Sequence, residues 1–125
     1  MDPILLKYRG NDNEYLIYDT GKFQSALAPR AVRSLCARNF GLGTKGVMVG
    51  PIAENGRLVM KIYSPDGEEK QMEKDALAAG HRFLQDAGYI PSGTERSQAE
   101  STSRAFAVGK IFLSEEFVKT YLRTA

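Results

Sequence analysis

The side chains that enzymes use most often for chemistry occur here as a single histidine and a single cysteine. His81 lies beside Arg82 in an apolar stretch, with no second ligand or carboxylate at a spacing that suits a base or a metal site. Cys36 lies on the apolar stripe of a predicted helix, where a thiol behaves as a small hydrophobic side chain. We interpret both as structural, and no serine–histidine–acid or cysteine–histidine set can be assembled.

A glycine-rich run at residues 41–46 resembles a phosphate-binding loop only superficially. It lacks the full spacing of that motif and lies between a predicted helix and a strand, which reverses the required order. The aromatic residues follow strand and helix periodicities, so we predict that they pack in the core rather than stack on bases.

Composition limits the class of protein. The 125 residues suit one domain, and 42% hydrophobic content suffices for a core. The net charge of +2 is too small for a nucleic-acid or membrane footprint. One cysteine excludes an internal disulfide and any multi-thiolate metal site, and it fits a reducing cytoplasm. We predict a small soluble cytoplasmic domain without nucleic-acid or membrane partners.

The elements that position these residues are of mixed α and β type. Asn55-Gly56 is a strong hairpin signal between two strands. One helix is predicted from Pro29 to a stop at Gly41 and Gly43, and a closing helical turn follows Ser114 as N-cap. The helix at 73–87 is apolar around most of its circumference, so we expect it to be enclosed. The predicted strands are 4–8, 15–18, 47–52, 58–63, 68–72 and 105–113.

One segment differs in character from the rest of the chain. Residues 91–104 hold six Ser/Thr and only Ala99 as a conventional apolar residue, which predicts a flexible connector. The chain is therefore divided into a core at 1–90, a connector at 91–104, and a C-terminal strand and helical turn at 105–125.

Several blocks of the sequence resemble diaminopimelate epimerase. Residues 7–19, KYRGNDNEYLIYD, are similar to the family's opening K-[FY]-x-G-x-G-N-D-[FY]-x-x-x-D. Residues 38–46 are similar to R-x-x-G-x-G-A-D-G, and residues 63–67 to [FY]-N-x-D-G. Residues 67–89 align with the segment that carries C-G-N-G-x-R, and 108–117 resemble the family's C-terminus.

The resemblance implies an α+β fold in which each of two lobes is a β-barrel wrapped around a central helix. It also implies cofactor-independent amino-acid epimerisation in lysine biosynthesis. One cysteine from each lobe acts there, one removing the α-proton and the other returning it on the opposite face. Here a single lobe is expected, with its C-terminal strand crossing back and residues 91–104 joining the ends that the second lobe would bridge.

The departures from the family fall at the positions that carry this chemistry. Glu73 occupies the position of the family's first-lobe cysteine. The G-N-G residues that follow that cysteine are replaced by Lys74, Asp75 and Ala76. Ser64 replaces the substrate-binding asparagine, and Lys45 replaces an aspartate. Asn13 is retained. We expect no catalytic residue, no metal and no cofactor, and a pocket remnant formed by Asn13, Ser64 and Asp75.

These substitutions favour an inactive lobe whose former cleft face is covered with charge. Acidic side chains at the start of the helix stabilise its dipole but repel an anionic ligand. We expect an engineered or minimised half-enzyme that folds alone as a monomer, or a natural pseudoenzyme that acts as a protein-binding module. The alternative is an epimerase active only as a weak homodimer through the former cleft face, with Glu73 as its only candidate base.

Overall fold

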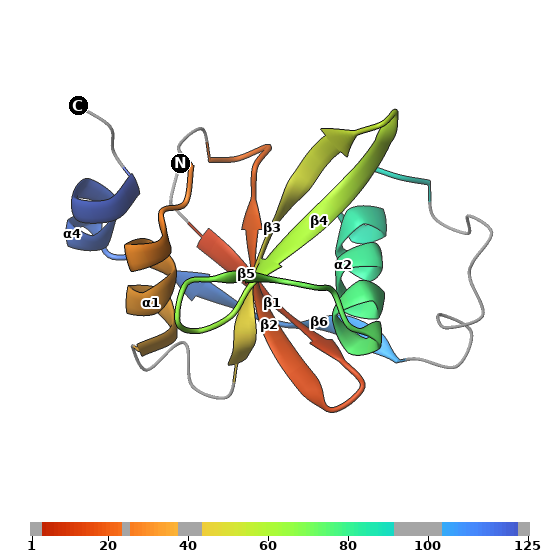
Figure 1. The fold of residues 1–125 in the computed structure, drawn as a ribbon, viewed down its shortest axis with the longest axis horizontal. Helices are drawn as coiled ribbons and strands as arrows, with labels where there is room; N and C mark the ends of the chain where they lie inside the picture. Colours follow the sequence, from red (N-terminus) through yellow and green to blue (C-terminus); the bar gives the residue numbers. More distant parts are fainter. Residues whose placement is uncertain (1–3, 24–25, 38–43, 92–103, 123–125) are drawn as a thin grey trace.

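The computed structural model describes residues 4–23, 26–37, 44–91 and 104–122, which form one mixed sheet with helices on both faces (Figure 1). The six strands lie in the order β5-β4-β3-β2-β1-β6. The strands are β1 (Ile4–Gly10), β2 (Asn13–Asp19), β3 (Thr44–Glu54), β4 (Arg57–Tyr63), β5 (Glu69–Lys70) and β6 (Ala105–Phe112). The helices are α1 (Pro29–Ala37), α2 (Lys74–Asp86) and α4 (Glu115–Phe117), the last continuing into the π-helical turn η2 (Val118–Leu122).

Two hairpins form at turns whose residues tolerate a positive φ, and the second is the one predicted at Asn55-Gly56. β1 and β2 pair antiparallel around Asn11, which has a φ of 54°. β3 and β4 pair around Asn55 and Gly56, with φ values of 53° and 78°. Asparagine and glycine adopt this left-handed conformation at low cost, so the local sequence determines both turns.

The β2–β3 pair is parallel, and α1 lies in the connection between the two strands. β2 is buried on both faces from Tyr15 to Asp19, as expected for a strand covered by helices on each side. No local signal in the sequence predicts this pairing, because a parallel partner follows from the path of the connection rather than from a turn.

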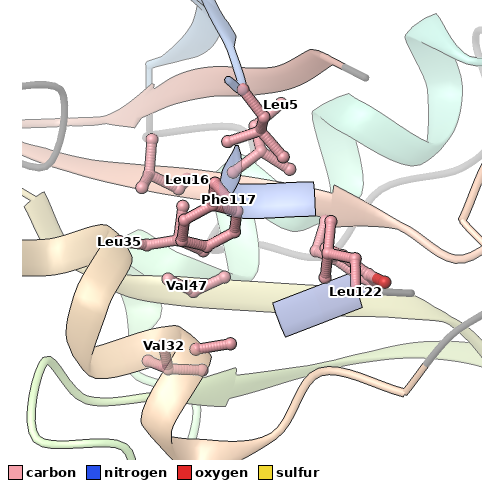
Figure 2. Close-up of a cluster of buried hydrophobic side chains, with 10 residues drawn as sticks. Leu5, Leu16, Val32, Leu35, Val47, Phe117 and Leu122 are labelled. Carbon is pink, nitrogen blue, oxygen red and sulfur yellow. The ribbon is translucent and has the colours of Figure 1, made fainter. Parts of the chain in front are cut away.

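The sheet separates two hydrophobic clusters. The first lies on the face covered by α1, where Leu16 and Val47 pack with Val32 and Leu35, and Phe117 of α4 completes the cluster (Figure 2). The second lies on the opposite face, where Phe83 of α2 packs among side chains of β1, β2, β3 and β4. Successive side chains of a strand point to opposite faces of the sheet, so neighbouring residues of one strand pack in different clusters.

The predicted barrel is not confirmed. β5 and β6 are the two edges of the sheet, and the described strands include no pairing between them. The sheet nevertheless curves around α2, since this helix contacts β1, β2 and β6 and its Gly80 lies against Met60 of β4. The α+β class is correct, and the sheet is open.

The expectation of an enclosed second helix is wrong in part. Its Ala76, Ala79 and Phe83 are buried against the sheet, but Leu77 is 53% exposed. Arg82 and Asp86 are exposed as well. An open sheet covers one side of a helix, so the remaining side faces solvent whatever its hydrophobicity.

The C-terminal elements cover the α1 face of the sheet, and the helical turn after Ser114 forms as predicted. The Ser114 hydroxyl accepts a hydrogen bond of 3.0 Å from the Phe117 amide, so it caps this turn. Phe117 and Leu122 are buried in the first cluster, and Tyr121 packs against it. β6 pairs with β1, which joins the chain after residue 104 to the N-terminal hairpin.

Two expectations concern segments that the structure does not describe. The proposed connector falls almost entirely on residues 92–103, and the helix stop at Gly41 and Gly43 falls within 38–43; both lie outside the described residues. None of the described helices combines the length and the hydrophobicity that a membrane-spanning helix requires.

Candidate functional site

The start of α2 lies against the end of β1, where the resemblance places the pocket remnant. A Cβ atom at Gly10 would overlap the backbone carbonyl of Asp75, so only glycine permits this approach. The close packing brings the turn after Gly10 alongside the first turn of α2. Polar side chains from three elements meet there.

The carboxylate of Asp75 is the centre of this group. Its Oδ1 accepts a hydrogen bond of 2.6 Å from the Asn11 side-chain amide, and its Oδ2 accepts one of 2.7 Å from the Asn13 side-chain amide. Asp75 also lies in the first turn of α2, where the helix dipole favours an anion. We call Asp75, Asn11 and Asn13 the aspartate clamp.

The clamp is connected to β6 through Asn11. The backbone amide of Asn11 donates to the Arg104 carbonyl at 2.7 Å, and the Arg104 amide donates to Asn11 Oδ1 at 3.2 Å. Asn11 therefore joins the β1–β2 turn, the first turn of α2 and the start of β6.

Tyr15 lies beneath the clamp, with 2% of its surface exposed. The pKa of Tyr15 is raised to about 12, mainly by burial and also by the carboxylates of Asp75 and Glu73, whereas a hydrogen bond with Asn13 lowers it. The hydroxyl is therefore neutral at physiological pH and contributes a neutral dipole to the group.

Glu73 is the N-cap residue of α2 and is exposed to solvent. Its side chain makes no capping hydrogen bond, although its backbone carbonyl accepts one from Leu77 at 2.8 Å. The position that the resemblance assigns to the acid/base cysteine thus holds a carboxylate in water.

Ser64 does not join the clamp. Its hydroxyl donates to the Asp66 carboxylate and lies 3.2 Å from the Glu68 carbonyl oxygen, all within one exposed turn. The hydrogen bonds that the Asp66 carboxylate accepts from the Ser64 hydroxyl and from the Glu68 amide lower the pKa of Asp66. Of the three expected remnant residues, the structure brings together Asn13 and Asp75.

Two members of the site are absent from the sequence-based set. The sequence indicates an ordinary turn residue at Asn11 and an ordinary apolar strand position at Tyr15. The spacing of Asn13 and Tyr15 is the available signal, because residues two apart on a strand share a face. Its use requires knowing that α2 begins opposite that face.

The remaining candidates lie apart from this group or at its border. Lys45 and Lys74 are exposed, consistent with a charged surface at this end of α2. Cys36 packs at the edge of the first hydrophobic cluster, and burial raises the pKa of its thiol, which disfavours the reactive thiolate. Among the described residues, no group of three or more His, Cys, Asp or Glu side chains could hold a metal ion.

In chemical terms, the clamp is an anion-binding group whose anion, the Asp75 carboxylate, is already in place. Two amide donors and a helix N-terminus are a suitable receptor for an anion, and here the anion belongs to the chain itself. Both carboxylate oxygens of Asp75 accept hydrogen bonds from these donors, so an added carboxylate would meet the negative charge of Asp75 first.

Comparison with known proteins identifies diaminopimelate epimerases among the relatives of this chain. Diaminopimelate epimerase 2 of Nostoc sp. is 32% identical over 85 residues, 67% of this chain and 30% of that protein. Diaminopimelate epimerase of Nostoc punctiforme is 33% identical over 119 residues, 90% of this chain and 40% of that protein. The enzyme of the same name from Methanothrix thermoacetophila is 28% identical over 88 residues, 68% of this chain. No family model matches the chain.

Proposed function

Because the chain is related in sequence to diaminopimelate epimerases and spans about 30 to 40% of the length of these relatives, we propose that it is a single epimerase-like lobe without epimerase activity. The observation that carries the proposal is the aspartate clamp, in which Asn13 already binds the Asp75 carboxylate at 2.7 Å. The proposal applies both to an engineered or minimised half-enzyme and to a natural pseudoenzyme, because neither origin requires turnover.

The clamp opposes binding of an amino-acid substrate. Asn13 is the polar residue that the resemblance retains, and its side-chain amide donates one N–H to Asp75. A substrate carboxylate would have to displace a charge-assisted hydrogen bond and approach a fixed anion. Each of these costs about 1–3 kcal/mol, so we expect no measurable affinity for diaminopimelate.

The acid/base chemistry is also unsupported. Epimerisation of the kind implied by the resemblance requires a group that removes the α-proton in a site shielded from water. Glu73 is exposed and lies beside Asp75, so its carboxylate is solvated rather than held against a substrate.

Proton exchange tests the proposal directly. The chain is incubated with diaminopimelate in heavy water, and loss of the α-proton signal is followed by NMR, with the Nostoc punctiforme enzyme as positive control. We expect exchange at the rate of a protein-free blank. Exchange clearly above the blank contradicts the proposal.

The same experiment evaluates the homodimeric epimerase. If exchange occurs, the Glu73→Gln variant identifies whether Glu73 is the base, because the amide cannot accept the α-proton. Loss of exchange in Glu73→Gln would support that alternative, with Lys74→Gln as the matched control at the neighbouring exposed position.

A further inference from the structure

The outer edge of β4 is covered only at one end. β5 has two residues and pairs with the last two residues of β4, so the hairpin end of β4 extends past it (Figure 1). Just beyond β4, the Ser64 amide donates to the Glu68 carbonyl at 2.8 Å, on the β5 side. Backbone groups of successive residues in an antiparallel strand point to opposite edges. Those of Met60 and Leu58 therefore point to the same outer edge as those of Ser64.

This edge carries unpaired backbone groups beside an apolar side chain. Among the described residues, no hydrogen bond to the outward N–H and C=O groups of Leu58 and Met60 is present. The Leu58 side chain is 40% exposed. Free donors and acceptors on a strand edge are a template for pairing with another extended segment.

The side chains of β4 differ in chemistry between the two faces of the sheet. Met60 packs in the second hydrophobic cluster against Gly80 of α2, and Leu58 is two residues away on the same face. Arg57 and Lys61 lie on the opposite face. Within the described ranges, neither of these two cations forms an ion pair. The edge thus presents an apolar side chain on one face and two uncompensated cations on the other.

We propose that the outer edge of β4 binds an extended segment of a partner protein, which pairs as an added strand and alternates apolar with acidic residues. Its apolar side chains lie on the α2 face beside Leu58, and its acidic side chains lie on the opposite face beside Arg57 and Lys61. The proposal is independent of the absence of epimerase activity.

Charge argues against a second copy of β4 as the occupant. An antiparallel pair of β4 strands centred on Val59 places the two cations of one copy opposite the two cations of the other, and like charges directly opposite each other are destabilising. An acidic segment reverses the sign of both contacts, so complementary charge selects it.

The size of the free edge limits the strength of binding. Residues 57–61 of β4 remain for pairing, so the contact is smaller than the roughly 1,200 Å² at the low end of specific interfaces. Glu54, the cross-strand neighbour of Arg57, also lowers the net positive charge of this edge. We expect a dissociation constant on the order of 100 μM, rising with ionic strength because the charged contacts are near the surface.

The test titrates the chain into a short fluorescein-labelled peptide that alternates glutamate with valine, with fluorescence anisotropy as the measurement. A peptide that alternates lysine with valine is the control for charge. The glutamate–valine peptide with N-methylated backbone amides is the control for strand pairing, because it cannot donate to β4.

Variants of the chain locate the contact. Arg57→Glu reverses one cation of the proposed site. Lys110→Glu is the matched control, since it changes the net charge equally at an exposed position on β6, the opposite edge of the sheet. Circular dichroism verifies folding, and Lys61→Glu replaces Arg57→Glu if that variant does not fold. NMR follows the backbone amides of Leu58 and Met60.

We expect the glutamate–valine peptide to bind and to shift these two amide signals. Its dissociation constant should rise about threefold to tenfold in Arg57→Glu and change by less than about twofold in Lys110→Glu. The lysine–valine and N-methylated peptides should bind at least about tenfold more weakly.

The proposal is overturned if the glutamate–valine peptide does not bind at about 1 mM protein, or if either control peptide binds as tightly. Equal weakening in Arg57→Glu and Lys110→Glu would show that net charge alone attracts the peptide and would overturn it too. Binding that leaves the amide signals of Leu58 and Met60 unchanged would place the contact elsewhere, with the same conclusion.

Discussion

At the residue scale, the aspartate at position 75 determines what its neighbours Asn11 and Asn13 bind. Asp75 lies in the first turn of α2, and the sequence alone predicts the electrostatic consequence of an acidic residue there. The sequence-based interpretation treats that charge as solvated, whereas in the structure Asn11 and Asn13 bind it. The difference arises because the two amides come from the β1–β2 hairpin, 62 to 64 residues earlier in the chain.

The clamp should contribute measurably to stability. Asp75→Ala removes two charge-assisted hydrogen bonds and a favourable dipole interaction, so we expect the free energy of unfolding to fall by about 1–3 kcal/mol. Glu73→Ala is the control, since an exposed side chain without a capping bond should change it by less than about 0.5 kcal/mol. Urea denaturation measures both, and equal losses would show that the clamp has no special role.

At the scale of elements, local signals predicted the β3–β4 hairpin, the helical segments and the cap at Ser114, because each depends on residues a few positions apart. The parallel β2–β3 pair and the open sheet have no such signals. The apolar circumference of α2 suggested enclosure, yet Leu77 is exposed because β5 and β6 do not meet. Long-range pairing decides which apolar residues are buried.

The approach of β1 to α2 depends on Gly10. Gly10→Ala would force its Cβ against the Asp75 carbonyl, and we expect a loss of about 1–3 kcal/mol in the free energy of unfolding. Gly109→Ala is the matched strand control, since a Cβ at Gly109 would meet nothing within 4 Å. Thermal denaturation compares the two, and a neutral Gly10→Ala would contradict the close packing.

The docking of the C-terminal turn is a second prediction at this scale. Phe117 is 2% exposed, whereas Phe112 is 65% exposed. We expect Phe117→Ala to lower the free energy of unfolding by about 3–5 kcal/mol and Phe112→Ala by less than about 0.5 kcal/mol. Dilute samples keep any association out of the comparison. Similar losses in both variants would argue against the packing in Figure 2.

At the scale of the whole molecule, four buried or hydrogen-bonded tyrosines with raised pKa values link stability to alkaline pH: Tyr8, Tyr15, Tyr18 and Tyr89. Burial is the main cause that raises the pKa of Tyr15, Tyr18 and Tyr89 from 10 to about 12. The unfolded chain loses these protons first, so their contribution is complete below pH 10 and is lost as the pH rises to about 12.

We expect the free energy of unfolding to fall between pH 10 and 12 with a slope of up to about 1.4 kcal/mol per pH unit for each tyrosine. Tyr15→Phe should reduce that slope, since phenylalanine does not titrate. Urea denaturation at a series of pH values measures the slope, and tyrosinate absorbance reports the ionisation. A free energy that does not change over this interval would contradict the raised pKa values.

The pairing of Ile4 in β1 with Phe112 in β6 has a consequence for biosynthesis. β1 is translated well before β6, so a nascent chain that ends between these two strands exposes the apolar face of β1 and lacks Phe117 from its core. Chaperone binding and premature aggregation should therefore concentrate in the interval before residues 105–122 are translated, and synonymous codons that slow translation there would prolong it.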